Sequence, residues 1–286
     1  MNPLGVLLGL ASAGTWGTAD FLGGFVARRI GALPTAAASQ AIGLLGALTI
    51  ALLAGERVPG ALPLFWGAVA GLCGVSGVVA FYRALADGTM GIVSPVVAVI
   101  GAAVPTVVGI LLGDRIAPPA LAGIACALVA IVVVSGFTPG QRSGSVERAA
   151  LPLIVAAGLG FAGFFLGIDQ AVRAGGEVWW PLVAARAASA VVSLVVVARI
   201  GGLRPSPWGE WRLLVAVGLG DLLGNAFFVL ANDQGTLGAA AVLSSLYPVT
   251  TVLLARVVLG ERLRVGQAIG VGLALLGVVL IALPGG

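Results

Sequence analysis

Five charged side chains interrupt long apolar stretches of this sequence, and they are the residues best placed to do chemistry. In the hydrocarbon of a membrane, a charged side chain at the centre of a helix costs about 2.5 to 3.5 kcal/mol. Each of them therefore needs an opposite charge, a water-filled cavity or a proton. The five, with two amides from similar stretches, are Asp20, Asp169, Arg186, Asp221 and Arg256, together with Asn225 and Asn232.

A polar stripe runs along one of the last apolar stretches. Asp221 and Asn225 are four residues apart and share one face of a helix, and Phe228 and Asn232 extend that face. A polar face on an apolar helix must look inward. Asp221 lies about ten residues into the stretch, near the middle of a membrane, and we expect it to bind substrate or carry a proton. The alternative is a permanent ion pair with Arg186.

Asp20 is a second candidate, because it follows Trp16 by four residues and lies on the same helix face. An aromatic ring beside a carboxylate suits an organic cation or an amino group, through charge and cation–π attraction. The alternative is an ion pair with Arg28 or Arg29, where the helix leaves the membrane. Asp169 lies close to the end of its stretch, and we expect it at the membrane interface.

Arg186 keeps its positive charge under ordinary conditions and therefore needs an anion. Three anions remain open for it: Asp221, Asp169 and the carboxylate of a substrate. Arg256 lies about one helical turn from Glu261, and we expect this second arginine to be a structural anchor.

Hydroxyl and aromatic side chains provide the remaining candidates. Ser244, Ser245 and Tyr247 precede Pro248, which removes a backbone donor and is expected to kink the helix. Hydroxyl groups beside such a kink could contact a substrate or could bond to the preceding helical turn. The expected substrate-binding residues are Trp16, Asp20, Tyr82, Phe165, Arg186, Asp221, Asn225, Ser244, Ser245 and Tyr247, with Asp221 and Asp20 as candidate proton carriers.

Several classes of function are excluded by what the sequence lacks. It has no histidine, and its two cysteines, Cys73 and Cys126, are far apart, so we predict no metal site and no histidine-based catalysis. No phosphate-binding loop of the Gly-Lys-Ser or Gly-Lys-Thr type occurs. The arginines are scattered, which disfavours a nucleic-acid partner. We therefore predict a protein that is not an enzyme, uses no cofactor and draws on a gradient of substrate, protons or another ion.

The stretches that carry these residues predict an all-α membrane protein. Only 9% of the 286 residues are charged and the mean hydropathy is +1.13, whereas a soluble surface needs about 25% charged residues. Ten apolar stretches are each long enough to cross a bilayer core of roughly 30 Å as a helix. They cover about 4–27, 34–54, 64–86, 90–112, 118–136, 150–173, 179–198, 211–232, 238–258 and 265–283.

The chain is predicted to consist of two five-helix repeats. Residues 235–281 resemble residues 88–134 at a constant spacing of 147 residues, without a gap. The clearest match is Leu112-Gly113-Asp114-Arg115, which returns as Leu259-Gly260-Glu261-Arg262. An odd number of helices per repeat inverts the second copy in the membrane, as in many secondary transporters that work by alternating access. The expected boundaries are 1–140 and 148–286 for the repeats, with a linker near 137–149.

The arginines also predict an orientation, because short cytoplasmic loops accumulate positive residues. Ten arginines fall in loops on the side opposite Met1, and only Arg57, Arg115 and Arg173 fall on the side of Met1. Both termini are therefore expected outside the cytoplasm.

These motifs resemble the EamA family of the drug/metabolite transporter superfamily. The two turns at 112–115 and 259–262 carry the resemblance, together with Trp16–Gly24 and Ser244–Pro248. The resemblance covers nearly the whole chain and implies a multi-pass permease of the bacterial inner membrane, with a central cavity between its halves. It also implies a secondary transporter, commonly an exporter of amino acids or related small metabolites.

The expected substrate is a small zwitterionic or cationic metabolite, with its positive group at Asp20 or Asp221 and any negative group at Arg186. One alternative is a multidrug exporter of the same fold, and another is a membrane enzyme or lipid-handling protein. Both a monomer and a homodimer remain open. The aromatic residues that would line a multidrug exporter are Trp16, Phe164, Phe165 and Phe228.

Overall fold

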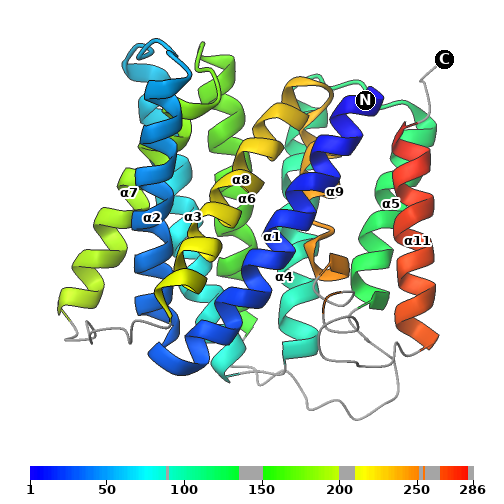
Figure 1. Cartoon of the computed structure of the whole chain (residues 1–286). Helices are drawn as coiled ribbons and strands as arrows, with labels where there is room; N and C mark the ends of the chain where they lie inside the picture. The colour runs from blue at the N-terminus through cyan, green and yellow to red at the C-terminus, as the bar shows by residue number, and fades with distance from the viewer. Residues whose placement is uncertain (88–89, 135–150, 200–209, 251–253, 255–264, 283–286) are drawn as a thin grey trace.

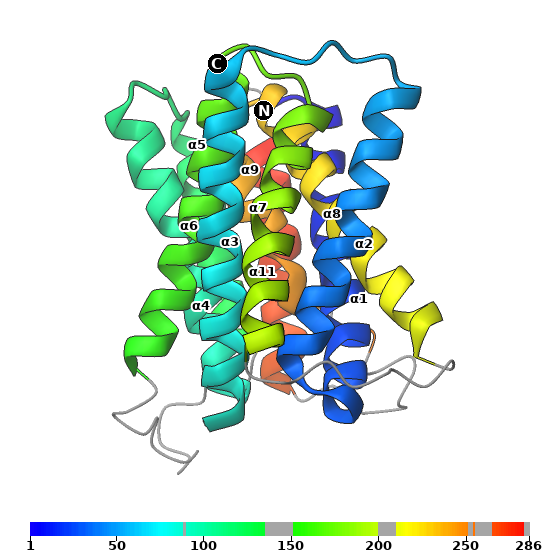
Figure 2. The ribbon, with the colours of Figure 1, turned by 90° about the vertical axis from the view of Figure 1, so that its left-hand side faces the viewer.

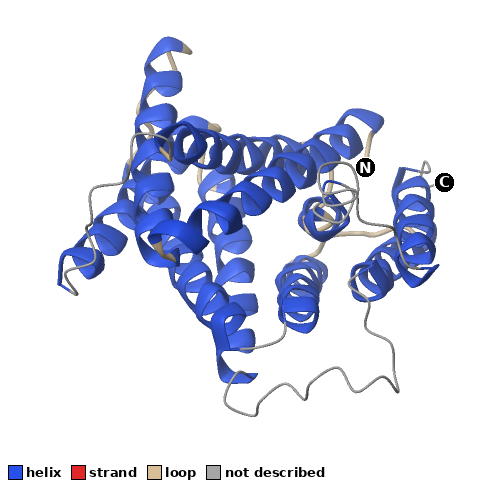
Figure 3. Ribbon diagram, turned by 60° about the horizontal axis from the view of Figure 1, so that its bottom comes forward, coloured by secondary structure: helices blue, strands red, loops and turns tan. Residues whose placement is uncertain are grey.

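The computed structural model describes residues 1–87, 90–134, 151–199, 210–250, 254 and 265–282. All regular structure in these residues is helical (Figure 3). The predicted linker near 137–149 and the residues Arg256 and Glu261 lie outside the described part, as do the side chains of Arg28 and Tyr82. The helices are α1 (Pro3–Ile30), α2 (Ala32–Leu53), α3 (Ala61–Asp87), α4 (Met90–Leu111), α5 (Pro118–Val134), α6 (Leu151–Arg173), α7 (Trp179–Arg199), α8 (Trp211–Asp233), α9 (Leu237–Ser244) and α11 (Val265–Ala282).

The composition and surface of these helices suit a membrane. Five of them contain segments of 21 to 23 residues that are long and apolar enough to cross a bilayer. Large apolar side chains cover the outside of the bundle; Leu53 and Leu111, for example, are 83% and 78% exposed. Such a surface would be unstable in water and is natural in lipid. The chain is therefore a multi-pass membrane protein.

The second half of the bundle runs against the first. In Figure 1, α1 descends from the N-terminus at the top, whereas α6, the corresponding helix of the second repeat, begins at the bottom and rises; Figure 2 shows the same opposition from the side. The packing has matching symmetry, because α1 packs on α8 as α6 packs on α3. The pairs α2 with α7, α4 with α9 and α5 with α11 also join the two halves. Each helix of one repeat therefore packs against a helix of the other repeat.

Helix backbones touch where α3 crosses α6 and α7. A Cβ atom at Gly160 of α6 would lie 2.6 Å from the Cα atom of Gly77 in α3, and one at Gly71 would overlap the carbonyl group of Ala185 in α7. Only glycine permits this approach. The contact fixes the position of α7 directly beside Arg186, which follows Ala185 in the chain.

The ninth predicted span is broken inside the bundle. α9 ends at Ser244, and a turn follows before helical structure resumes at Tyr247. Pro248 has no backbone N–H and cannot bond to the Ser244 carbonyl four residues earlier. The kink predicted from Pro248 is therefore present. By contrast, α4 is continuous through Pro95 and Pro105.

The α4–α5 turn is closed by the glycine of the Leu-Gly-Asp-Arg motif. Gly113 has a φ of 105°, which side chains other than that of glycine rarely allow. The Gly113 N–H donates to the Ile110 carbonyl (3.1 Å), and the Asp114 N–H donates to the Gly109 carbonyl (2.9 Å). This is a Schellman motif, which ends α4 and positions Asp114. The matching turn at 259–262 lies outside the described residues.

Replacing Gly71 by alanine tests the close packing of α3 on α7. The added methyl group would collide with the Ala185 carbonyl, and we expect the detergent-solubilised protein to lose about 1 to 3 kcal/mol of stability, measured by thermal unfolding. Gly14→Ala is the matched control, because a Cβ there meets nothing within 4 Å. Equal unfolding temperatures for the two variants would contradict the described contact.

Candidate functional site

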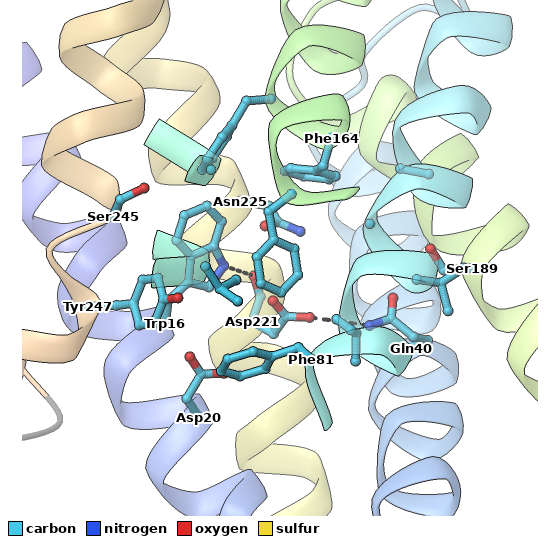
Figure 4. A pocket seen from close by; sticks show the side chains of 18 of the residues that line it. Trp16, Asp20, Gln40, Phe81, Phe164, Ser189, Asp221, Asn225, Ser245 and Tyr247 are labelled. Atoms are coloured by element: carbon cyan, nitrogen blue, oxygen red, sulfur yellow. Dashed lines mark hydrogen bonds between the residues drawn. The ribbon is translucent and has the colours of Figure 1, made fainter. Parts of the chain in front are cut away.

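A cavity lies between the two repeats (Figure 4). It is lined by residues of seven helices, α1–α4 and α6–α8, and by the break after α9. Its volume is about 110 Å³, measured as the space open to the centres of water molecules. Since about 10 to 15 Å³ holds one water, the cavity can take several waters or a small solute. Eight of the ten expected substrate-binding residues line it: Trp16, Asp20, Phe165, Arg186, Asp221, Asn225, Ser245 and Tyr247.

The charged centre of the cavity joins three helices. Arg186 of α7 donates from Nη1 to the Asp221 carboxylate of α8 (2.6 Å) and to the Gln40 side-chain carbonyl of α2 (2.7 Å). The Gln40 amide in turn faces the same Asp221 oxygen at 3.4 Å. The side chain of Arg186 is only 4% exposed, and that of Asp221 is 30% exposed. Of the three anions open to Arg186, Asp221 is therefore the one that it contacts.

A glycine of α2 makes room for the Arg186 side chain beside α8. A Cβ atom at Gly43 of α2 would lie 3.3 Å from Cδ and 3.4 Å from Nε of Arg186, and 3.4 Å from the carbonyl oxygen of Gly218 in α8. Nε and Nη2 of Arg186 are buried without a hydrogen-bond partner among the described residues. A buried, charged arginine lowers the stability of the folded protein unless its counter-charge stays close. Asp221 and Gln40 are therefore required to hold Arg186 inside the bundle.

Asp20 is the carboxylate of the cavity that no described residue neutralises. It lies on α1, is exposed where it lines the cavity, and makes no hydrogen bond or ion pair with a described residue. Of the two arginines predicted as alternative partners, Arg29 instead contacts Glu210 at 2.6 Å, and the side chain of Arg28 lies outside the described part. Asp20 is therefore placed to face a solute.

An aromatic cluster adjoins the charged centre. The ring of Trp16 lies 5.7 Å from that of Phe165 and 6.4 Å from that of Phe228, and the last two rings are 4.5 Å apart. Trp16 Nε1 donates to the backbone carbonyl of Asp221 (3.2 Å). A side chain at Gly224 would overlap the indole. The indole N–H is thus used to hold α1 on α8, while the ring faces the cavity.

The break after α9 places two of the three predicted residues in the cavity. Ser245 and Tyr247 line it, and Ser244 is fully buried outside its lining. Gly17 of α1 packs against this break, because a Cβ there would lie 2.7 Å from the Tyr247 carbonyl oxygen. The side chain of Tyr82, the remaining predicted residue, lies outside the described part.

A second polar network closes the end of the bundle where the N-terminus lies (Figure 1). Asp169 accepts from Arg173 Nε (2.7 Å) and from Asn232 Nδ2 (2.9 Å), and Arg173 Nη2 lies 3.6 Å from Asp114 of the first repeat. Asp169 is 3% exposed. Asp169 lies near the end of α6 and is buried there because Arg173 of α6 and Asn232 of α8 donate to it; its position at the membrane interface stays a prediction. Asn232 belongs to this network and not to the cavity.

Some cavity residues were missed by the sequence analysis. Gln40 had a usable signal, because it is an amide inside an apolar stretch, the same criterion that selected Asn225. Nothing in the sequence distinguishes Phe81 and Phe161 from other core aromatics. Ser189 donates to the Gly71 carbonyl (2.8 Å). Its place in the sequence does not distinguish it from other serines in the apolar stretches. The described residues contain no group of three or more acidic, cysteine or histidine side chains placed to hold a metal ion.

Sequence comparison matches this architecture to a known family. The profile of the EamA-like transporter family matches residues 3–136 and again residues 148–283. The chain belongs to the EamA-like transporter family. Members of this family are transporters and not enzymes, so the EamA-like fold indicates a membrane transporter that acts on a small molecule.

Structure comparison supports the EamA-like fold. One solved structure, described only as "Crystal structure of protein", superimposes with a TM-score of 0.79 over 98% of this chain and 96% of its own, at 20% sequence identity. At this identity the likeness concerns the fold alone. No curated protein is similar enough in sequence to count as a relative.

A double-mutant cycle tests the ion pair at the charged centre. Asp221→Leu alone leaves the Arg186 guanidinium buried without its counter-charge and should cost about 3 kcal/mol; Arg186→Met alone strands the carboxylate, which is less buried, and should cost less. The double variant removes both charges and should unfold at a higher temperature than Asp221→Leu. Thermal unfolding in detergent measures all four proteins. Additive losses would show that the two side chains do not stabilise each other.

Proposed function

We propose that this EamA-like protein is a secondary transporter that exports a small zwitterionic or cationic metabolite, such as an amino acid, across a bacterial inner membrane. The observation that carries the proposal is the cavity between the repeats, in which Asp20 faces open space while Asp221 is already neutralised by Arg186. Export and the bacterial inner membrane rest on the family resemblance.

The charges of the cavity favour a substrate with an ammonium group. Asp221 and Arg186 cancel, and Asp20 leaves one negative charge in the cavity. An ammonium group would neutralise it, and the Trp16 ring one helical turn away adds cation–π attraction. In the absence of substrate, a proton can serve the same purpose. Asp20 would thus exchange a proton for substrate and couple export to a proton gradient.

Alternating access provides the route. Inverted repeats allow the two halves to exchange conformations, so that one central site opens to each side in turn. In this structure the network of Asp114, Asp169 and Arg173 joins the repeats at the end that holds the N-terminus. The arginine distribution predicts that this end faces away from the cytoplasm. The cavity would then load substrate from the cytoplasmic side.

Transport by purified protein in liposomes tests the proposal. A panel of radiolabelled amino acids should include at least one compound whose flux depends on a pH gradient. Asp20→Asn should reduce that flux at least tenfold, because the amide can neither hold an ammonium group nor exchange a proton. Asp233→Asn, an exposed change at the end of α8, is the matched control and should leave flux intact. Absence of gradient-dependent flux for every compound, from monodisperse protein, would refute the proposal.

The aromatic cluster supports a second candidate, a multidrug exporter for hydrophobic cations. Trp16, Phe164 and Phe165 line the cavity and would bind such cations by stacking. The substitution Asp221→Asn distinguishes a carrier of zwitterions from a pump for hydrophobic cations. A carrier of zwitterions should lose at least tenfold in flux, since the change releases Arg186 from its partner and disturbs the site. A pump for hydrophobic cations should keep much of its flux for a dye such as ethidium. Flux is compared per amount of monodisperse protein.

A further inference from the structure

The two repeats line the cavity with different chemistry at equivalent positions. With the spacing of 147 residues, Asp221, Asn225 and Ser245 of the second repeat correspond to Gly74, Val78 and Ala98 of the first. All six residues line the cavity. At these three pairs of positions the second repeat therefore carries a polar side chain where the first carries a small or apolar residue.

The apolar positions form one continuous wall. It is built by α3, α4 and α6, which pack on one another, and the described side chains that these helices bring to the cavity are all apolar. Phe81 and Phe161 meet edge to face with ring centroids 5.9 Å apart, and Phe164 meets Phe165 in the same way at 6.0 Å. Gly74 leaves room for the Phe164 ring, since a Cβ there would lie 3.3 Å from its Cδ2 atom.

The polar positions form the facing wall. It is built by α1, α2, α7, α8 and the break after α9, which also contact one another. Its side chains include Gln40, Asp221 and Asp20 (Figure 4), of which Asp20 has no partner among the described residues, together with Arg186. Ligand sites are commonly apolar with a few placed polar groups. Here the two kinds of group lie on separate walls, so a bound molecule must itself have two ends.

We propose that the substrate is amphipathic, with a zwitterionic head group on the polar wall and an apolar group, branched or aromatic, on the wall of α3, α4 and α6. The inference rests on the proposed transport function and deepens it. A wholly polar zwitterion would leave the apolar wall in contact with water, and an apolar amine would bring no carboxylate to accept from the Asn225 amide and the Ser245 hydroxyl of the polar wall.

Competition against a transported amino acid in liposomes tests the two-ended site. Leucine and phenylalanine should compete at concentrations at least tenfold lower than glycine, serine or glutamate, which lack the apolar group. Leucine and phenylalanine should also compete at lower concentrations than 3-methylbutylamine, which lacks the carboxylate of leucine, and 4-methylpentanoate, which lacks its ammonium group. Equal competition by glycine or by the amine would overturn the inference while leaving transport intact. Absence of flux for all compounds would instead count against the transport function.

Two variants connect the selectivity to the apolar wall. Val78→Thr has nearly the same shape and places a hydroxyl on that wall; it should reduce the preference for leucine over glycine at least threefold. Val79→Thr is the matched control on the neighbouring, outward-facing position, where valine is 39% exposed, and should keep the full preference. Ala98→Ser places on the apolar wall the side chain that Ser245 has at the equivalent position of the second repeat. It is the variant to test if Val78→Thr is not monodisperse. An unchanged preference in both cavity variants would refute the proposed wall.

Discussion

A guanidinium group inside a membrane protein must keep a counter-charge within hydrogen-bonding distance, and much of this structure follows from that constraint. Arg186 meets it through Asp221 at 2.6 Å and Gln40 at 2.7 Å. Because the three residues come from α7, α8 and α2, one interaction sets the relative depth of three helices. The space for it comes from Gly43, whose missing side chain lets the arginine pass between α2 and α8. Charge and close packing thus depend on each other.

The same constraint distinguishes the end of the molecule near the N-terminus from its centre. At the end near the N-terminus, Asp169 and Asp114 share Arg173 in a network that joins the repeats. In the centre, Asp221 shares Arg186, but Asp20 has no described partner and faces the cavity. A network of paired charges suits a closed end of a transporter, whereas a carboxylate without a described partner suits a binding site. The distribution of partners therefore gives the symmetric framework a direction.

Symmetry of the backbone does not extend to the chemistry of the side chains. The EamA-like repeats pair their helices in the same way, yet Asp221 and Asn225 stand opposite a glycine and a valine at equivalent positions. Inversion requires similar helix lengths, turns and close contacts, and these are features of the backbone. It places no demand on the residues that line the cavity. The equivalent helices α3 and α8 can therefore bring different chemistry to the cavity, apolar from α3 and polar from α8.

The sequence by itself determined the class of fold and most of the charged and polar residues of the cavity. Apolar stretches must be long enough to cross a bilayer, and charges such as Asp20, Arg186 and Asp221 are rare enough in them to be recognised one by one. Only the tertiary structure decided which groups meet: Arg186 had three possible anions, and Asp169 was not expected to bond to Asn232 of α8. A pairing depends on how far each helix is rotated and how closely it packs on its neighbours. Those quantities are set by contacts such as Gly71 on Ala185, between residues far apart in the chain, and no local pattern records them.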